Sequence, residues 1–212
     1  MRIDELWIYG DSLSTGTHGE NAYLDALTQR FGIKRLRNFA VGSSGLTLRT
    51  PNSMVSILKR QLEEDFCGEN GTPQVILIWH GSNDWYWGSD LEQFRRDVCW
   101  VVDALRERFP DALIVWPTPI FRLETPDGMS VTADAYKNPN RNGNVMGDFV
   151  KALRDCSTLC HFPVIDMGRR VNIHMFNEGV CLEDHVHPNA EGYRRIANVL
   201  CREIEACAGD AL

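Results

Sequence analysis

The sequence predicts an α/β fold in which about five parallel strands form one sheet with helices on both faces. Two observations support this: short apolar runs alternate with longer amphipathic stretches, and the alternation extends along the whole 212-residue chain without a linker or repeat. Strands joined by helical crossovers run parallel, and the helices then cover both faces of the sheet. We therefore expect a single domain over residues 1–212.

The expected strands are the short apolar runs, at residues 6–9, 36–40 (a weaker run), 75–79, 113–116 and 164–166. The expected helices lie between or after these runs, near residues 20–31, 52–66, 90–108, 144–157 and 189–206. Within the third of these helices, apolar residues recur at the helical spacing that predicts one buried face: Leu91, Phe94, Val98, Val101, Val102 and Leu105.

Residues 118–143 depart from this alternation, because they carry many turn-forming residues and little periodicity. A loop of this length inside a compact domain is commonly either functional or disordered. Two interpretations stay open: a lid that covers a site, and a plain surface excursion.

Composition limits the partners and environment that we expect. The net charge is −7 without a Lys/Arg-rich tract, so nucleic acid is not an expected partner. No apolar run approaches the roughly 20 residues that span a bilayer, and no signal peptide is recognisable at the start. We expect a cytoplasmic protein, although a secreted chain with its signal removed would read the same. Seven cysteines in such a chain predict free thiols rather than a disulfide framework.

Polar residues follow the expected strands at the end where open parallel sheets bind ligands. The first run, LWIYGDSLSTG, delivers Ser12 into a turn, which by itself is either a solvated Asx turn or a nucleophile at a strand end. The second run leads into NFAVGSSG, where Gly42 leaves an unshielded N–H. The third ends in GSND, where the amide of Asn83 can stabilise an oxyanion without titrating.

A carboxylate and an imidazole lie close together before the last expected helix, in DHVHPN. Asp184 and His187 are three residues apart, a spacing that lets the carboxylate fix the tautomer of the ring. Because His185 lies between them, a zinc site of Asp184, His185, His187 and His174 is an alternative, although no fourth ligand is compelling. A capped helix start with exposed histidines is the plainer alternative.

Three aromatic residues, Trp85, Tyr86 and Trp87, follow Asn83 directly. They either line an apolar or sugar-binding wall or pack over the edge of the sheet. The hydroxyl, the open glycine, the amide and the Asp/His pair together are the components of an acyl-transfer site.

At these positions the sequence resembles the SGNH hydrolases, also called the GDSL esterase/lipase family. GDSLSTG resembles the first block with Ser12, Gly42 and Asn83 match the second and third blocks, and Asp184 and His187 match the last. The blocks occur in the expected order from residue 6 to residue 195. The resemblance implies a flavodoxin-like three-layer α/β/α fold and hydrolysis without a cofactor or metal.

The resemblance also implies a role for each of these residues. Ser12 is the expected nucleophile, His187 the base and Asp184 the residue that orients it. The N–H groups of Ser12 and Gly42 and the side chain of Asn83 form the expected oxyanion hole. Asp11 is expected to brace the turn around Ser12.

The expected substrate is a small soluble ester with a short-chain acyl or acetyl group, including acetylated carbohydrate. An acyltransferase, a thioesterase or a lysophospholipase could use the same triad. A metal-dependent hydrolase and an inactive carbohydrate-binding module are the alternatives from other classes.

Overall fold

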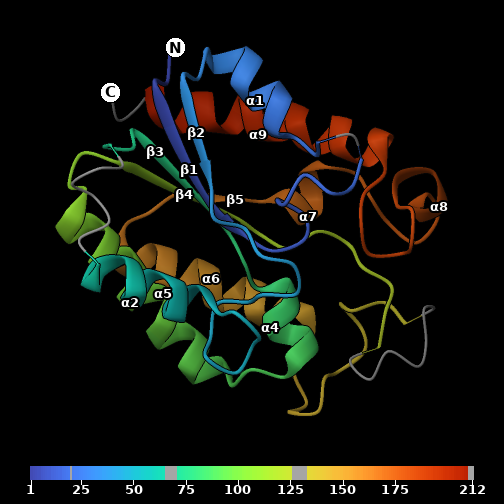
Figure 1. Cartoon of the computed structure of the whole chain (residues 1–212). Helices are drawn as coiled ribbons and strands as arrows, with labels where there is room; N and C mark the ends of the chain where they lie inside the picture. The colour runs from blue at the N-terminus through green and yellow to red at the C-terminus, as the bar shows by residue number, and fades with distance from the viewer. Residues whose placement is uncertain (20, 65–70, 126–132, 210–212) are drawn as a thin grey trace.

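A five-stranded parallel sheet with the order β2-β1-β3-β4-β5 forms the centre of the computed structural model, which describes residues 1–19, 21–64, 71–125 and 133–209 (Figure 1). Its strands are β1 (Glu5–Gly10), β2 (Arg35–Asn38), β3 (Val75–Trp79), β4 (Leu113–Pro117) and β5 (Val164–Ile165). The predicted α/β fold with about five parallel strands is confirmed.

The neighbouring inner strands β1 and β3 are buried along their whole length, in a register that pairs Leu6 with Val75 and Gly10 with Trp79. Helices cover both faces of a parallel sheet, which explains why these strands are nearly continuous apolar runs. Successive side chains serve opposite faces: Trp7 belongs to one hydrophobic core and Ile8 to the other.

Helices form the outer layers. On one face lie α1 (Leu24–Phe31) and α9 (Ala190–Gly209), and on the other lie α2 (Met54–Glu63), α5 (Leu91–Arg108) and α6 (Met146–Cys160) (Figure 1). All five match predicted helices. Helix α1 begins at Leu24 rather than near residue 20. Asn21 and Ala22 adopt positive φ angles, which a right-handed helix does not allow.

Shorter elements follow the carboxyl ends of the strands. They are α4 (Ser82–Trp87), α7 (Met167–Arg170) and α8 (Glu178–Cys181). The sequence predicted only a turn where α4 lies. In the long segment at 118–143, residues 126–132 lie outside the described residues. The described flanks contact each other, since Leu123 bridges to Asp134 and the Tyr136 hydroxyl donates to the Pro119 carbonyl at 2.9 Å. The segment also contacts α4, where the side-chain amide of Asn140 donates to the Trp85 carbonyl at 3.0 Å.

Two sequence-based expectations about the whole chain can be compared with the described residues. None of the helices in these ranges is long and apolar enough to cross a membrane. No disulfide joins any of the six described cysteines, and Cys67 lies outside the described residues.

Candidate active site

The turn after β1 places Ser12 at the edge of the sheet. Asp11 closes this turn, since its carboxylate Oδ1 accepts the N–H of Leu13 at 3.0 Å and its carbonyl accepts the N–H of Ser14 at 2.9 Å. Gly10 is required for space and not for an unusual φ angle, because a Cβ there would lie 2.6 Å from Ser14 Oγ. The expected bracing role of Asp11 therefore matches its contacts.

Ser12, His187 and Asp184 form a continuous chain of hydrogen bonds. His187 Nε2 lies 2.8 Å from Ser12 Oγ, and His187 Nδ1 lies 2.6 Å from Asp184 Oδ2. The structure thus brings together the three residues predicted for the triad, although Ser12 and His187 are 175 positions apart in the sequence. Both distances are within the range that proton transfer between a nucleophile and a base requires.

Asp184 is held as a carboxylate beside the ring. Its Oδ1 accepts the backbone N–H groups of Val186 and His187 at 3.1 and 2.7 Å. Partial burial acts to raise the pKa of Asp184, but the hydrogen bonds from the His187 backbone and ring outweigh this and hold the pKa below its ordinary value. An ionised Asp184 favours the tautomer with the proton on His187 Nδ1, which leaves Nε2 able to accept a proton from Ser12.

The Asn83 amide lies between the turn that carries Ser12 and the loop that contains Gly42. Its Nδ2 donates to the Ser44 carbonyl at 2.8 Å and to Asp11 Oδ2 at 3.3 Å. Gly42 is exposed, and a Cβ built there would meet no atom within 4 Å. The predicted oxyanion donors therefore sit on adjoining elements, with the Gly42 backbone open to solvent.

A buried carboxylate that had no predicted role, Asp84, fastens this loop to α4. Its two oxygens accept the N–H groups of Leu46 and Thr47 at 2.9 and 3.0 Å, and the hydroxyl of Ser89 at 3.2 Å. Burial raises the pKa of Asp84 against the effect of these hydrogen bonds. Because Asp84 is next to Asn83, one helix positions both the amide and the loop.

The aromatic cluster after Asn83 is divided between the core and the surface. Trp85 is 0% exposed and belongs to the hydrophobic core. Tyr86 and Trp87 are partly exposed, and the indole N–H of Trp87 donates to the Ser43 carbonyl at 3.1 Å. The expected aromatic wall is therefore reduced to Tyr86 and Trp87.

The alternative set of metal ligands is not brought together. His185 Nδ1 pairs with Glu178 Oε2 at 2.9 Å, and His174 Nδ1 accepts the N–H of Phe176 at 3.2 Å. Across the ranges that the structure describes, no three His, Cys, Asp or Glu side chains are placed to hold one metal ion.

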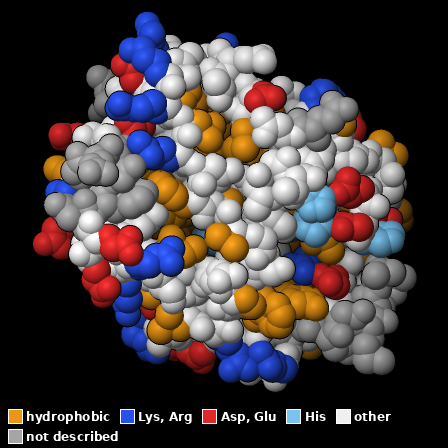
Figure 2. All heavy atoms as spheres, in the orientation of Figure 1, with side chains coloured by type: hydrophobic (Ala, Val, Ile, Leu, Met, Phe, Trp, Pro, Cys, Tyr) orange, Lys and Arg blue, Asp and Glu red, His pale blue; other side chains and the backbone are white. Residues whose placement is uncertain are grey.

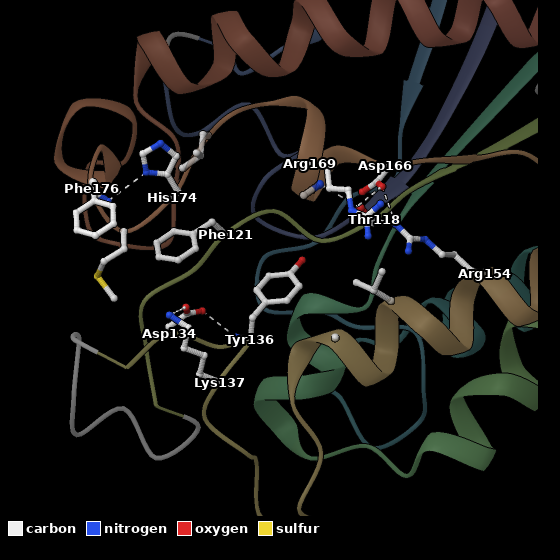
Figure 3. A pocket seen from close by; sticks show the side chains of 15 residues that line it. Thr118, Phe121, Asp134, Tyr136, Lys137, Arg154, Asp166, Arg169, His174 and Phe176 are labelled. Atoms are coloured by element: carbon white, nitrogen blue, oxygen red, sulfur yellow. Dashed lines mark hydrogen bonds and ion pairs between the residues drawn. The ribbon is translucent and has the colours of Figure 1, made fainter.

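A cavity of about 670 Å³ lies beyond the carboxyl ends of β4 and β5 (Figure 3). Its walls are largely apolar, with Phe121 and Phe176 toward one end and the Arg154–Asp166–Arg169 ion-pair cluster toward the other (Figure 3). Neither Ser12 nor His187 lines it. No sequence pattern predicts this cavity, because its residues come from four separate segments.

Arg122 is a further residue at the site, and no sequence pattern predicts it. It is 6% exposed, and its Nη1 donates to Ser82 Oγ and to Asn83 Oδ1, both at 3.1 Å.

The surface of the molecule is shown in Figure 2. Histidine and acidic side chains are grouped on one part of this face, above a hydrophobic patch.

The chain is similar in sequence to one protein family and in fold to several solved structures. The model of the GDSL-like Lipase/Acylhydrolase family matches residues 8–195. No curated protein matches the chain. Among solved structures, a protein from Lactobacillus plantarum is similar with a TM-score of 0.81 at 18% identity, covering 97% of this chain and 98% of that one.

Two further structures of the same fold have named activities. A salicylyl-acyltransferase from a tetracycline biosynthetic pathway has a TM-score of 0.73 at 18% identity, covering 98% of this chain and 56% of that one. An acetyl-xylooligosaccharide esterase from Geobacillus stearmophilus has a TM-score of 0.66 at 15% identity, covering 95% of this chain and 94% of that one. At these identities the likeness concerns the fold, whereas the family match spans most of the sequence. The chain belongs to the GDSL-like lipase/acylhydrolase family, the SGNH hydrolases.

Proposed function

We propose that the protein is a serine esterase that cleaves carboxylic esters through an acyl-enzyme on Ser12. The observation that carries this proposal is the hydrogen-bonded chain from Ser12 Oγ through His187 to Asp184, with distances of 2.8 and 2.6 Å. His187 Nε2 takes the proton of the Ser12 hydroxyl as Oγ attacks the ester carbonyl, and then gives it to the departing alcohol. Water, deprotonated by the same ring, attacks the acyl-enzyme and releases the acid, which regenerates Ser12.

The oxyanion that forms at each step is stabilised by the N–H groups of Ser12 and Gly42 and by the Asn83 amide. Of the two hydrogen bonds from Asn83 Nδ2, the one to Asp11 is the longer, at 3.3 Å against 2.8 Å for the Ser44 carbonyl. A hydrogen bond weakens as it lengthens. The hydrogen directed at Asp11 is therefore the one that an oxyanion takes over.

The substrate that we propose first is a small soluble ester with an acetyl or short acyl group. Tyr86 and Trp87 offer partly exposed rings on which a sugar can stack, and a protein of the same fold is an acetyl-xylooligosaccharide esterase. The 670 Å³ cavity favours a second candidate, an ester with a larger apolar group, because its walls are mostly hydrophobic. Transfer of the acyl group to an alcohol other than water is the third, and a salicylyl-acyltransferase shares the fold.

A fluorophosphonate probe tests the chemistry, since it phosphonylates an activated serine. We expect it to label the wild-type protein at Ser12 and to leave Ser12→Ala unlabelled. Labelling at another residue, or none, overturns the proposal. Hydrolysis that stops after exhaustive chelation would favour a metal-dependent reaction instead.

A series of p-nitrophenyl esters of increasing acyl length, with Ser12→Ala as the blank, separates the substrate candidates. A sharp preference for acetate supports deacetylation, and a medium-chain optimum supports use of the cavity. Adding an acceptor alcohol and measuring the new ester against free acid identifies a transferase.

A further inference from the structure

We propose that Arg122 is a positioning residue for the oxyanion donor Asn83, an inference that rests on the proposed esterase function. Arg122 comes from the irregular segment after β4, whereas Asn83 lies in α4. The guanidinium Nη1 donates to Asn83 Oδ1 and to Ser82 Oγ, both at 3.1 Å. The side chain is almost fully buried, so Arg122 acts on the reaction through Asn83 rather than by touching a substrate.

The first consequence concerns the orientation of the Asn83 amide. A guanidinium group has only hydrogen-bond donors, so the amide atom that faces it must be the oxygen. A reversed amide would place two donors against each other in a buried site and would leave the Ser44 carbonyl without its donor. Arg122 therefore fixes Nδ2 on the side of the nucleophile turn and the Gly42 loop, where Nδ2 contacts Asp11 and Ser44.

The second consequence concerns the strength of that donor. A cation that hydrogen bonds to the amide oxygen draws electron density from the amide and makes the Nδ2 hydrogens more acidic. The effect is largest where water is excluded, and Asn83 is buried as well. An oxyanion on the far side of the amide thus meets a polarised donor that is already in place before the reaction starts.

Arg122 is itself held on several sides, as a positioning group must be. Glu124 Oε2 accepts its Nε–H at 2.8 Å and also contacts Nη2. The guanidinium carbon lies 4.8 Å from the ring centroid of Tyr86 and 5.8 Å from that of Trp85, within cation–π range. These contacts keep the guanidinium in one place and leave Nη1 directed at Asn83.

A double-mutant cycle tests whether Arg122 acts through Asn83. We expect Asn83→Ala to lower kcat by about 10²- to 10³-fold, the usual effect of losing one oxyanion donor. We expect Arg122→Met to lower kcat by about 10- to 100-fold with KM within about twofold, since the donor is weakened rather than removed. In the Asn83→Ala background, Arg122→Met should change kcat by less than about twofold, because its target is gone.

A trifluoromethyl ketone, which forms a charged tetrahedral adduct on a serine, gives a second readout. Its affinity should fall in Arg122→Met by about the same factor as kcat, because both depend on the oxyanion. The matched control is Arg95→Met, which removes a partly buried arginine that pairs with Asp155 at 2.9 Å between α5 and α6. Arg95→Met should keep wild-type kcat and wild-type affinity for the ketone.

Several outcomes overturn the inference. An equal loss from Arg122→Met in the wild-type and Asn83→Ala backgrounds means that Arg122 acts independently of Asn83, and a change in KM alone means that it binds substrate. If Arg122→Met fails to fold, Arg122→Lys replaces it in the cycle, because lysine keeps the charge and loses the planar fork that serves Ser82 and Asn83 together. A wild-type protein that neither hydrolyses esters nor reacts with a fluorophosphonate refutes the esterase proposal itself, and this inference with it.

Discussion

The imidazole ring of His18 lies flat against that of His187, with ring centroids 4.0 Å apart and ring planes only 5° from parallel. The Nδ1 atom of His18 contacts the carboxylate of Glu183, which anchors the outer ring. The His187 ring, the proposed base, is thus held along one edge by Asp184 and across one face by His18. This stack limits rotation of the ring away from Ser12.

Removing the stack should slow catalysis without abolishing it. Aromatic pairs contribute about 0.5–1.5 kcal/mol beyond the area they bury, so we expect His18→Ala to lower kcat by about three- to tenfold. His18→Phe should recover most of the loss, since it restores a flat ring. Steady-state kinetics on one p-nitrophenyl ester measure both variants, and a phenylalanine variant as slow as the alanine variant would show that the stack is not the cause.

The triad makes a graded prediction. Ser12→Ala and His187→Ala should each lower kcat by about 10⁴- to 10⁶-fold, because each removes a group that the acylation step cannot do without. Asp184→Ala should lower kcat less than His187→Ala, since orientation is only part of what the ring needs. Circular dichroism of each variant verifies folding, and substantial turnover by purified Ser12→Ala would contradict the triad.

Asn83 and Gly42, two of the proposed oxyanion donors, should respond differently to substitution by alanine. Asn83→Ala removes the donating group, whereas Gly42→Ala keeps the N–H and places a Cβ where no protein atom lies within 4 Å. We therefore expect Gly42→Ala to retain kcat on p-nitrophenyl acetate within about threefold, against a loss of about 10²- to 10³-fold for Asn83→Ala. Parallel kinetics and thermal unfolding of the pair measure this, and an equal loss in both would contradict it.

Asp11 should make stability depend on pH in the acid range. Burial raises its pKa from an ordinary 3.8 to about 6, against the Leu13 N–H and the charge of Arg122. Between about pH 4 and 6 the folded protein then binds more protons than the unfolded chain, so this contribution to stability falls as the pH rises.

Asp11→Asn removes that dependence. The rise in the pKa of Asp11 corresponds to about 3 kcal/mol of stability. We therefore expect the free energy of unfolding of Asp11→Asn, minus that of the wild type, to increase by about this amount from pH 4 to pH 7. Urea unfolding at several pH values measures the difference, in which the titration of other carboxylates cancels. A difference that is flat across this range would show that Asp11 titrates normally.

The cavity beyond β4 and β5 predicts a change in chain-length preference. Phe176 is 95% exposed and lines the cavity, so Phe176→Ala removes apolar surface where a long acyl or alkyl group would lie. We expect KM for a medium-chain ester to rise about three- to tenfold, with the acetate ester unchanged. Leu159→Ala, at an exposed position on α6 outside the cavity, is the control, and equal effects of the two variants would contradict a role for the cavity.

The central strands were predictable because their residues are buried on both faces, as the run from Val75 to Trp79 shows. The edge strand β2 was placed less accurately: its sequence RLRN is mostly polar, and it ends at Asn38 rather than at Ala40. The helix α4 has six residues, which are too few to show a periodic pattern, so the sequence predicts a turn there instead of a helix. Local sequence thus predicts the elements whose burial is uniform or periodic.

The proposed triad residues, which the structure brings together, could be selected from the sequence because they lie in short blocks of a known order. Arg122 could not, because its partner Asn83 is 39 residues away and an arginine in an aperiodic segment normally faces solvent. His18 and His187 are likewise joined only by the fold. The opposite difference occurs at Trp85. The sequence offers it as a possible part of a substrate-binding wall, whereas in the structure it is buried in the core.

The three residues 122–124 join the two halves of the site. Arg122 contacts the amide of Asn83, and the N–H of Leu123 donates at 3.0 Å to the carbonyl of His185, in the loop that carries the proposed base, His187. For directed evolution, these contacts separate residues 122–124, which join parts of the site, from the later residues of the segment after β4. A library that randomises it throughout would disconnect the donor from the base loop in most of its members. A library that keeps 122–124 and varies the exposed positions of 133–145 would explore new substrate preferences at little cost to turnover.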